Sequence, residues 1–160
     1  MSLTFKELLA PIDDLDQRDA LESWHWLSGQ DARPLLLTAL GDLFILKDDG
    51  AVYFLDTYEG TLKPAGDSYE QWKVELNQEY NLYNWFSPLL VEKLRERGLR
   101  LQAGQCYSPV HPPVMGGAME PDNFEVSPWF VHFHIQGQIH DKLRGVPAGT
   151  PITGVDIKWE

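Results

Sequence analysis

Apolar residues follow a β-strand pattern along residues 41–56, in two runs on either side of Asp48, Asp49 and Gly50. In each run both alternating sets of positions are largely apolar, which is typical of strands that are covered on both faces of a sheet. Asp-Gly is a preferred pair for a tight turn, because glycine has no Cβ to oppose positive φ and aspartate tolerates it. We therefore predict a central β-hairpin over these residues.

The patterns on both sides of the hairpin predict further strands and helices. Helical spacing predicts two short helices within residues 1–33, with an acidic connector between them, and β-compatible runs extend the hairpin to an antiparallel meander over residues 34–64. Helices are predicted within residues 68–98, where Ser68 and Ser87 are both N-cap candidates and Ser87 precedes a proline.

The C-terminal part of the chain gives weaker signals. Prolines and glycines between residues 104 and 128 predict a long ordered loop with at most one short strand. Residues 129–144 fit two patterns, because apolar positions alternate with His132 and His134 as in a half-buried strand, yet they also recur at helical spacing. We predict a strand that passes into a helix after His134. Residues 99–101 and 155–159 are candidates for two further short strands.

The length of 160 residues fits a single domain over residues 1–160, in which residues 99–160 hold the loop, the strand or helix and a tail. The expected fold class is α+β, with helices packed against an antiparallel sheet. The single cysteine excludes an internal disulfide framework, and the N-terminus lacks the features of a signal peptide. No apolar run approaches the roughly 20 residues that span a bilayer. We therefore expect a soluble, cytoplasmic protein.

The net charge of -11 is concentrated in the first half of the chain. Residues 1–79 hold 16 acidic and 6 basic residues, whereas residues 80–160 hold 8 and 7. Such a surface disfavours direct binding to nucleic acid and speeds the encounter with a basic partner. Solubility alone is the simpler explanation of the charge.

Five residues are candidates for a soft-metal site or a cysteine-histidine pair, namely Cys106, His111, His132, His134 and His140, and the first four are the candidates for an alternative ligand site. A zinc site would need a compact motif with closely spaced cysteines, which this chain lacks, so we expect no metal and no cofactor. A buried structural cysteine and exposed or hydrogen-bonded histidines are the simpler interpretation. The alternative hypothesis is a small-molecule binder or an enzyme that uses this region.

Aromatic residues between positions 80 and 86 offer a different kind of site. Tyr83 and Trp85 are candidates for a partner surface, because tyrosine and tryptophan are favoured as interface anchors. Packing in the core is the alternative. A symmetric homodimer formed through these aromatic residues is a further possibility, so the chain is expected to be a monomer or a homodimer.

Several segments together resemble a known bacterial family. They are LTALGDLFI, DGAVYFLDTYEG, the helix opened by DSYEQW, the loop LQAGQCYSPVHPPVMGG, and HFHIQGQIHDKL. In order and spacing these segments are similar to the family that includes the C-terminal domain of the type VI secretion DNase immunity protein. More distantly, the chain is similar to the SUKH superfamily of toxin immunity proteins, which includes the cell-wall assembly regulator proteins.

The resemblance implies a SUKH-like α+β fold and a non-enzymatic role. Immunity proteins of this kind bind a cognate toxin, often a nuclease, and block it. We therefore expect a protein partner, such as a basic toxin, and neither nucleic acid nor a membrane. The candidate partner-binding residues are Asp48, Asp49, Asp56, Glu59, Tyr83 and Trp85.

Overall fold

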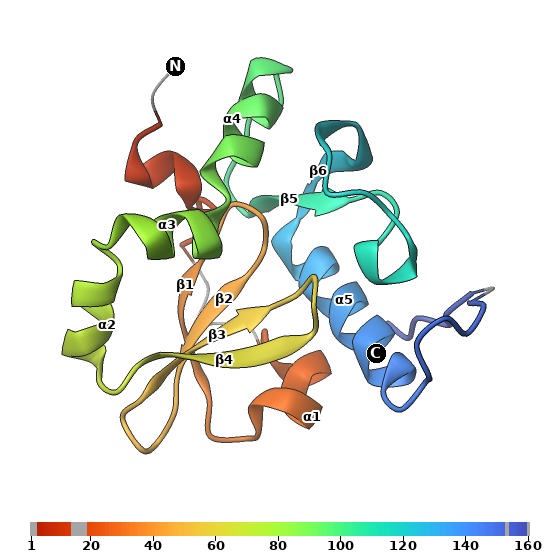
Figure 1. The fold of residues 1–160 in the computed structure, drawn as a ribbon, viewed down its shortest axis with the longest axis horizontal. Helices are drawn as coiled ribbons and strands as arrows, with labels where there is room; N and C mark the ends of the chain where they lie inside the picture. The colour runs from red at the N-terminus through yellow and green to blue at the C-terminus, as the bar shows by residue number, and fades with distance from the viewer. Residues whose placement is uncertain (1–2, 14–18, 153, 160) are drawn as a thin grey trace.

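The computed structural model describes residues 3–13, 19–152 and 154–159. Its centre is a four-stranded antiparallel sheet in the order β1-β2-β3-β4 (Figure 1). The strands are β1 (Arg33–Leu37), β2 (Leu43–Leu46), β3 (Val52–Asp56) and β4 (Thr61–Gly66). The predicted meander and the α+β fold class are therefore confirmed. Most of the predicted acidic connector lies outside the described residues.

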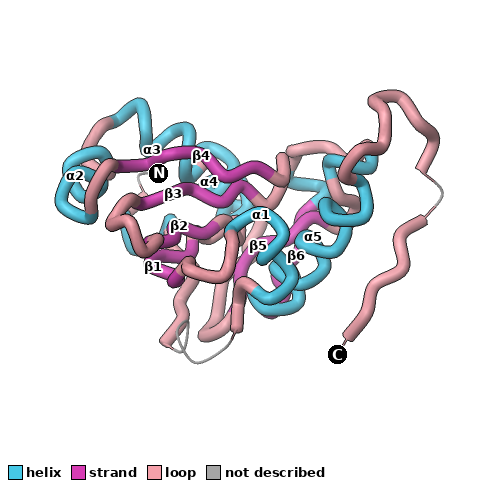
Figure 2. The backbone as a smooth tube through the Cα atoms, turned by 90° about the horizontal axis from the view of Figure 1, so that it is seen from below, coloured by secondary structure: helices cyan, strands magenta, loops and turns pink. Residues whose placement is uncertain are grey.

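Both faces of the sheet are covered, as the doubly apolar hairpin predicts. Phe44 pairs with Phe54 across β2 and β3, and both side chains face a cluster with α2 (Tyr69–Glu75), α3 (Glu79–Phe86) and α4 (Pro88–Glu96). Leu43 pairs with Leu55, and these side chains face a second cluster that contains Trp24 and Phe133. Figure 2 shows the strands between these layers. The hairpin therefore contributes to two cores at once.

The turn between β2 and β3 confirms the predicted role of its glycine. Gly50 has φ +87°, and its amide donates to the Lys47 carbonyl at 2.9 Å. Among the described residues other than glycine, Ser87 alone has positive φ, so Asp49 does not need the left-handed region. Instead, the Asp49 carboxylate accepts a hydrogen bond from the Ala51 amide at 2.9 Å. The result is a three-residue hairpin loop that ends on glycine.

The two predicted N-caps have different outcomes. Ser68 precedes α2, and its hydroxyl accepts a hydrogen bond from the Gln71 amide at 3.1 Å, so this N-cap is confirmed. Ser87 precedes α4 but makes no side-chain capping bond to the described residues. Because Ser87 also ends α3, its backbone takes the left-handed conformation of a helix C-terminus, with φ +46°, instead of the extended conformation of an N-cap.

The prediction for residues 129–144 is wrong in its first half. A single helix, α5 (Trp129–Leu143), begins at Trp129, so the strand predicted up to His134 does not form. The helix is buried over much of its circumference, with His132, Phe133 and Gln136 at most 2% exposed. Apolar residues on several sides of a buried helix can resemble strand alternation over a short window, which explains the error.

The predicted loop at residues 104–128 contains a two-stranded antiparallel sheet. Its strands are β5 (Gln105–Pro109) and β6 (Phe124–Pro128), and they are joined through the 3₁₀ turns η4 (Pro113–Met115) and η5 (Pro121–Asn123). The short strands predicted at residues 99–101 and 155–159 are not found in the described chain. Prolines and glycines therefore predicted the turns correctly, but they did not indicate that the segments beside these turns pair as strands.

The N-terminal helices are shorter than predicted. They are the 3₁₀ helices η1 (Phe5–Leu8) and η3 (Glu22–Trp24), and α1 (His25–Ser28). Trp24 is fully buried and its indole donates to the Phe133 carbonyl at 2.9 Å, which fastens η3 to α5. None of the helices in the described chain is both long and apolar enough to cross a membrane.

Candidate functional site

The acidic residues predicted for partner binding lie at opposite ends of the sheet. Asp48 and Asp49 form the β2–β3 turn, whereas Asp56 and Glu59 belong to the β3–β4 turn at the other end of β3. The structure therefore separates these carboxylates into two groups, and each group has its own surroundings.

The Asp48–Asp49 turn is exposed and is joined by other acidic residues. Val52 pairs with Gly66, so β4 ends at the end of the sheet that holds this turn, and α2 follows β4 directly (Figure 1). Asp67 precedes the N-cap of α2, and Glu70 lies in its first turn. The nearby cations are already paired: Lys47 contacts Asp31 at 3.5 Å and Lys73 contacts Glu70 at 3.2 Å. We call Asp48, Asp49, Asp67 and Glu70 the acidic end of the sheet.

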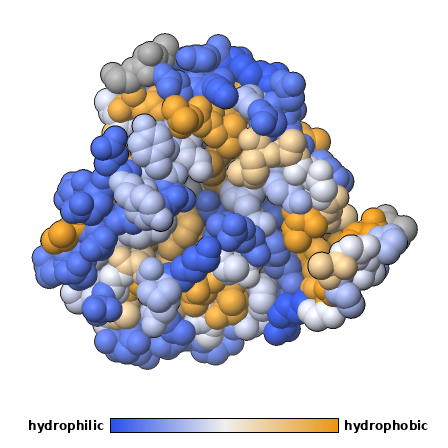
Figure 3. Space-filling view, in the orientation of Figure 1, coloured by the Kyte–Doolittle hydropathy of each residue, from blue (hydrophilic) through white to orange (hydrophobic). Residues whose placement is uncertain are grey.

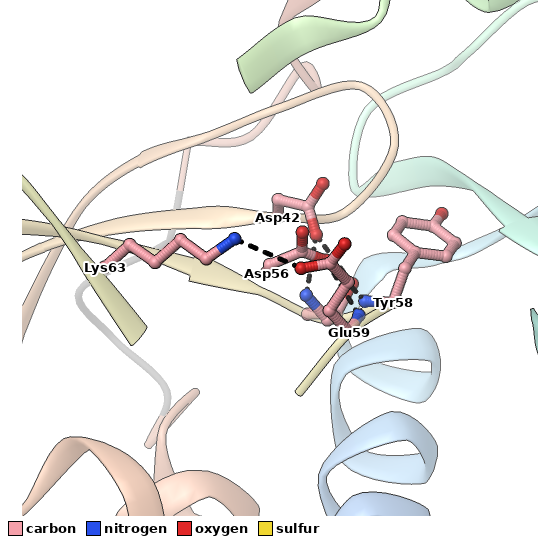
Figure 4. A network of polar contacts seen from close by, with 6 residues as sticks. Asp42, Asp56, Tyr58, Glu59 and Lys63 are labelled. Atoms are coloured by element: carbon pink, nitrogen blue, oxygen red, sulfur yellow. Dashed lines mark hydrogen bonds and ion pairs between the residues drawn. The ribbon is translucent and has the colours of Figure 1, made fainter. Parts of the chain in front are cut away.

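The β3–β4 turn uses its carboxylates to build the turn itself (Figure 4). Asp56 is half-buried, and one of its carboxylate oxygens accepts from the amides of Tyr58 and Glu59, both at 2.9 Å. Glu59 contacts Lys63 on β4 at 3.2 Å. Both carboxylates therefore have partners within the turn or on the adjacent strand.

Beside this turn lies a buried carboxylate, Asp42, in the loop between β1 and β2. One of its oxygens accepts from the Thr57 amide at 2.7 Å and from the Thr57 hydroxyl at 2.8 Å. Burial, followed by the negative charge of Asp56, raises the pKa of Asp42 well above its usual range. This bond network links the two loops at one end of the sheet.

The network continues from Thr57 into α5 and β5. The Thr57 hydroxyl lies 3.0 Å from Nε2 of His132, and the Ser108 hydroxyl lies 2.8 Å from Nδ1 of the same ring. Because the Thr57 proton points to Asp42, Thr57 accepts from Nε2–H, and Nδ1 accepts from Ser108. Burial lowers the pKa of His132 to about 3, so the ring is neutral. The network as observed crosslinks four segments of the fold.

The aromatic candidates on α3 have different environments. Trp85 packs on the sheet, with ring centroids 5.1 Å from Phe44 and 6.3 Å from Phe54. Tyr83 is 50% exposed and lines an open groove of about 340 Å³ with Leu89 and Met119. Core packing therefore accounts for Trp85, and Tyr83 remains available at the surface.

The four residues of the alternative ligand site do not share partners. Cys106 is buried in the second core cluster, and burial raises the pKa of its thiol. His111 is exposed and contacts the Met115 carbonyl at 3.0 Å, whereas His134 contacts the Ser23 hydroxyl at 2.6 Å. Across the described residues, none of the four hydrogen-bonds another, and no group of three or more histidine, cysteine or acidic side chains is placed to hold a metal ion.

Sequence reasoning found His132 but missed its partners Thr57 and Ser108, and it missed Asp42, which Thr57 connects to this network. Asp42 and Thr57 lie within the GD and LDT segments on which the family resemblance rests, and Ser108 follows the CY pair of the loop segment. The resemblance therefore contained the signal.

The α+β fold of this chain is also seen in a solved protein structure. It is similar to a solved structure described as the crystal structure of Atu4351 from Agrobacterium tumefaciens, with a TM-score of 0.53 and 16% sequence identity. The match covers 77% of this chain and 64% of that chain, so this chain spans less than two thirds of that protein. At this identity the likeness concerns the fold, and it confirms the predicted fold class.

Part of the chain also matches a known sequence family. Residues 66–140, just under half of the chain, match the family model described as T6SS immunity protein Tdi1, C-terminal. Comparison with curated protein sequences gave no match. The family match confirms, over these residues, the resemblance seen in the sequence. Its range runs from the end of β4 through most of α5 and includes Ser108 and His132.

Proposed function

We propose that this chain is a non-enzymatic, cytoplasmic immunity protein that neutralises a basic toxin by binding it directly. The observation that carries the proposal is the match of residues 66–140 to an immunity-protein family. The net charge of -11 supports a basic partner, and nucleases are one such class because their clefts bind phosphate. Residues 1–160 act as one domain in this proposal, since both core clusters combine N-terminal residues with residues beyond position 105.

The contact face in this proposal is centred on the acidic end of the sheet. Asp48, Asp49, Asp67 and Glu70 are all exposed there, and Tyr69 beside them is 44% exposed. Charged groups around an aromatic residue are common in interfaces, where the charges speed the encounter and the ring contributes buried area. Tyr83 is a second candidate contact because it too is exposed. Asp56, Glu59 and Trp85 have internal partners and serve as comparison positions.

The test is a pull-down of the full chain with a toxin encoded beside it. The expected result is a stable complex whose affinity falls as salt rises, because salt screens attraction between exposed charges. Coexpression should also protect cells from the toxin. If the purified chain neither binds nor protects against that toxin at low salt, the proposed function is wrong.

A further inference from the structure

A groove of about 340 Å³ lies between α4 and the end of α3 on one side and residues 119–121 on the other. Three of the residues that line it are exposed apolar side chains, with Leu89 at 61%, Tyr83 at 50% and Met119 at 44%. Tyr80 lies one helical turn before Tyr83 on α3 and is 78% exposed. A groove with exposed apolar side chains on both sides is typical of a surface at which another protein binds.

The charge around this groove differs from that of the chain as a whole. Residues 79–100 include α3 and α4 and hold three acidic and four basic residues, whereas the whole chain has a net charge of -11. This face therefore lacks the negative charge that would attract a basic toxin. It is a face at which two copies of an acidic chain can approach each other with little repulsion.

Two opposite charges line the groove, and both are unpaired. Lys93 and Glu120 are exposed, and neither makes an ion pair with another described residue. In a twofold dimer every contact occurs twice with the roles exchanged, so Lys93 of one copy would meet Glu120 of the other, and the reverse. The charges of the groove are therefore complementary to those of a second copy of the same groove.

We propose that the groove between α3, α4 and residues 119–121 is the interface of a symmetric homodimer. Tyr80 of each copy enters the groove of the other, and the two Lys93–Glu120 pairs fix the orientation. In Figure 1, α4 lies at the top and the β2–β3 turn at the lower left, so the dimer leaves the acidic end of the sheet free. Tyr83, the second candidate for a toxin contact, lies inside this interface.

Sedimentation velocity of the full chain over about 1–100 µM tests for the dimer, since interfaces of modest size bind in the micromolar range and below. The mass should rise with concentration from 18.3 kDa toward twice that value. Tyr80→Ala should leave a monomer throughout, whereas Tyr69→Ala makes the same change at the acidic end and should not alter association. Both rings are exposed, so both variants should fold. A natural chain that stays monomeric, or a dimer that Tyr80→Ala does not weaken, would overturn the proposal.

An exchange of charges tests the reciprocal pairing. Lys93→Glu places like charges opposite each other at both symmetric positions and should weaken association by roughly tenfold or more. Adding Glu120→Lys restores opposite charges and the original net charge, so the double variant should associate as the natural chain does. Lys142→Glu is the matched control for net charge, because Lys142 is exposed and does not line the groove.

A double variant that associates as weakly as Lys93→Glu would contradict the pairing of Lys93 with Glu120. Equal weakening by Lys142→Glu would contradict it as well, because net charge alone would then explain the loss. No toxin is present in these measurements, so their outcome is independent of the proposed function.

Discussion

Gly41 and Gly50 have the same positive φ, +87°, but different surroundings. A Cβ on Gly41 would lie 2.4 Å from Cδ2 of the buried His132 ring, whereas no described atom beyond the chain neighbours lies within 4 Å of a Cβ on Gly50. Alanine substitution at the two glycines therefore separates two costs of adding a Cβ. One is backbone strain, and the other is a clash with the network around His132.

Alanine substitution at these two glycines should give unequal losses of stability. Gly50→Ala should lower the free energy of unfolding by about 1–2 kcal/mol through strain alone. Gly41→Ala should cost about 1–3 kcal/mol more, because His132 would have to move within a packed site. Urea unfolding of both variants measures the difference. Equal losses would mean that the ring of His132 is not held against Gly41.

Asp42 and His132 should have opposite effects on stability as pH changes. The pKa of Asp42 is raised in the folded state. Its contribution to the free energy of unfolding therefore falls as pH rises above 3.8, the pKa of Asp42 in the unfolded chain. The pKa of His132 is lowered from 6.5 to about 3, so its contribution falls as pH drops through that window. Burial also lowers the pKa of His140, so His140 too contributes less to the free energy of unfolding as pH drops.

Asp42→Asn should therefore steepen the loss of stability in acid. The asparagine oxygen can still accept from Thr57, but the opposing carboxylate contribution is gone. Between pH 6.5 and 4, the free energy of unfolding should fall more in the variant than in the natural chain. Urea unfolding at a series of pH values measures both slopes, and parallel curves would contradict the assigned pKa shift of Asp42.

At the scale of elements, Ser68 and Ser87 are a matched pair at two helix starts. Ser68→Ala removes a capping bond to the Gln71 amide and should cost about 1 kcal/mol. Ser87→Ala removes no such bond to the described residues and should have little effect. Ser87→Gly should stabilise the chain, because glycine accepts φ +46° without strain. Thermal unfolding tests all three, and a large loss for Ser87→Ala would show a side-chain role there.

Residues 129–143 form helix α5 because of how they pack against the rest of the fold. Its residues Trp129, Phe133 and Ile139 are nearly fully buried, and Gly137 lies so close to Ser23 that a Cβ would be 2.6 Å from the Ser23 carbonyl oxygen. Such close packing requires a helix with small and large residues in a particular order. Alternation over a few positions could not distinguish this arrangement from a strand.

At the scale of the whole molecule, the distribution of charge decides which end should meet a basic partner. The space-filling view shows predominantly hydrophilic surface broken by separate hydrophobic areas (Figure 3). At the acidic end of the sheet, Asp48, Asp49 and Asp67 are exposed and make no ion pair with a described cation, whereas Glu70 contacts Lys73 at 3.2 Å. The β3–β4 turn at the opposite end holds Asp56 half-buried and Glu59 paired to Lys63.

Charge reversal should therefore have unequal effects at the two ends. Asp48→Lys with Asp49→Lys should lower the association rate with a basic toxin by roughly tenfold at low salt, because long-range attraction speeds encounter. Asp122 lies in η5, outside the acidic end, and contacts Arg97 at 2.5 Å. Glu59→Lys with Asp122→Lys makes the same change in net charge and should have a smaller effect. Association kinetics at low salt and at about 1 M salt, where screening acts within about 3 Å, measure both. Equal slowing would point to net charge rather than to the acidic end.

Much of the central sheet could be predicted because its signals are local. Strand alternation and the Asp49-Gly50 turn lie within one short segment, and Ser68 caps α2 through a residue three positions away. The β5–β6 pairing was missed because its strands are separated by proline-rich turns, so no single window contains both. The candidate contact residues were divided between two ends for a similar reason, since only the strand register shows which turns are neighbours.

Hydrophobic period, turn chemistry and charge need no long-range information, so the class of fold, the turn at Gly50 and the acidic character of the first half can be read from the residues alone. The tertiary structure alone decided the network around His132. Its hydrogen bonds join residues 15, 75 and 24 positions apart, from Asp42 to Thr57, Thr57 to His132 and Ser108 to His132. A bond between distant segments depends on how whole elements pack, so no local pattern of residues can specify it.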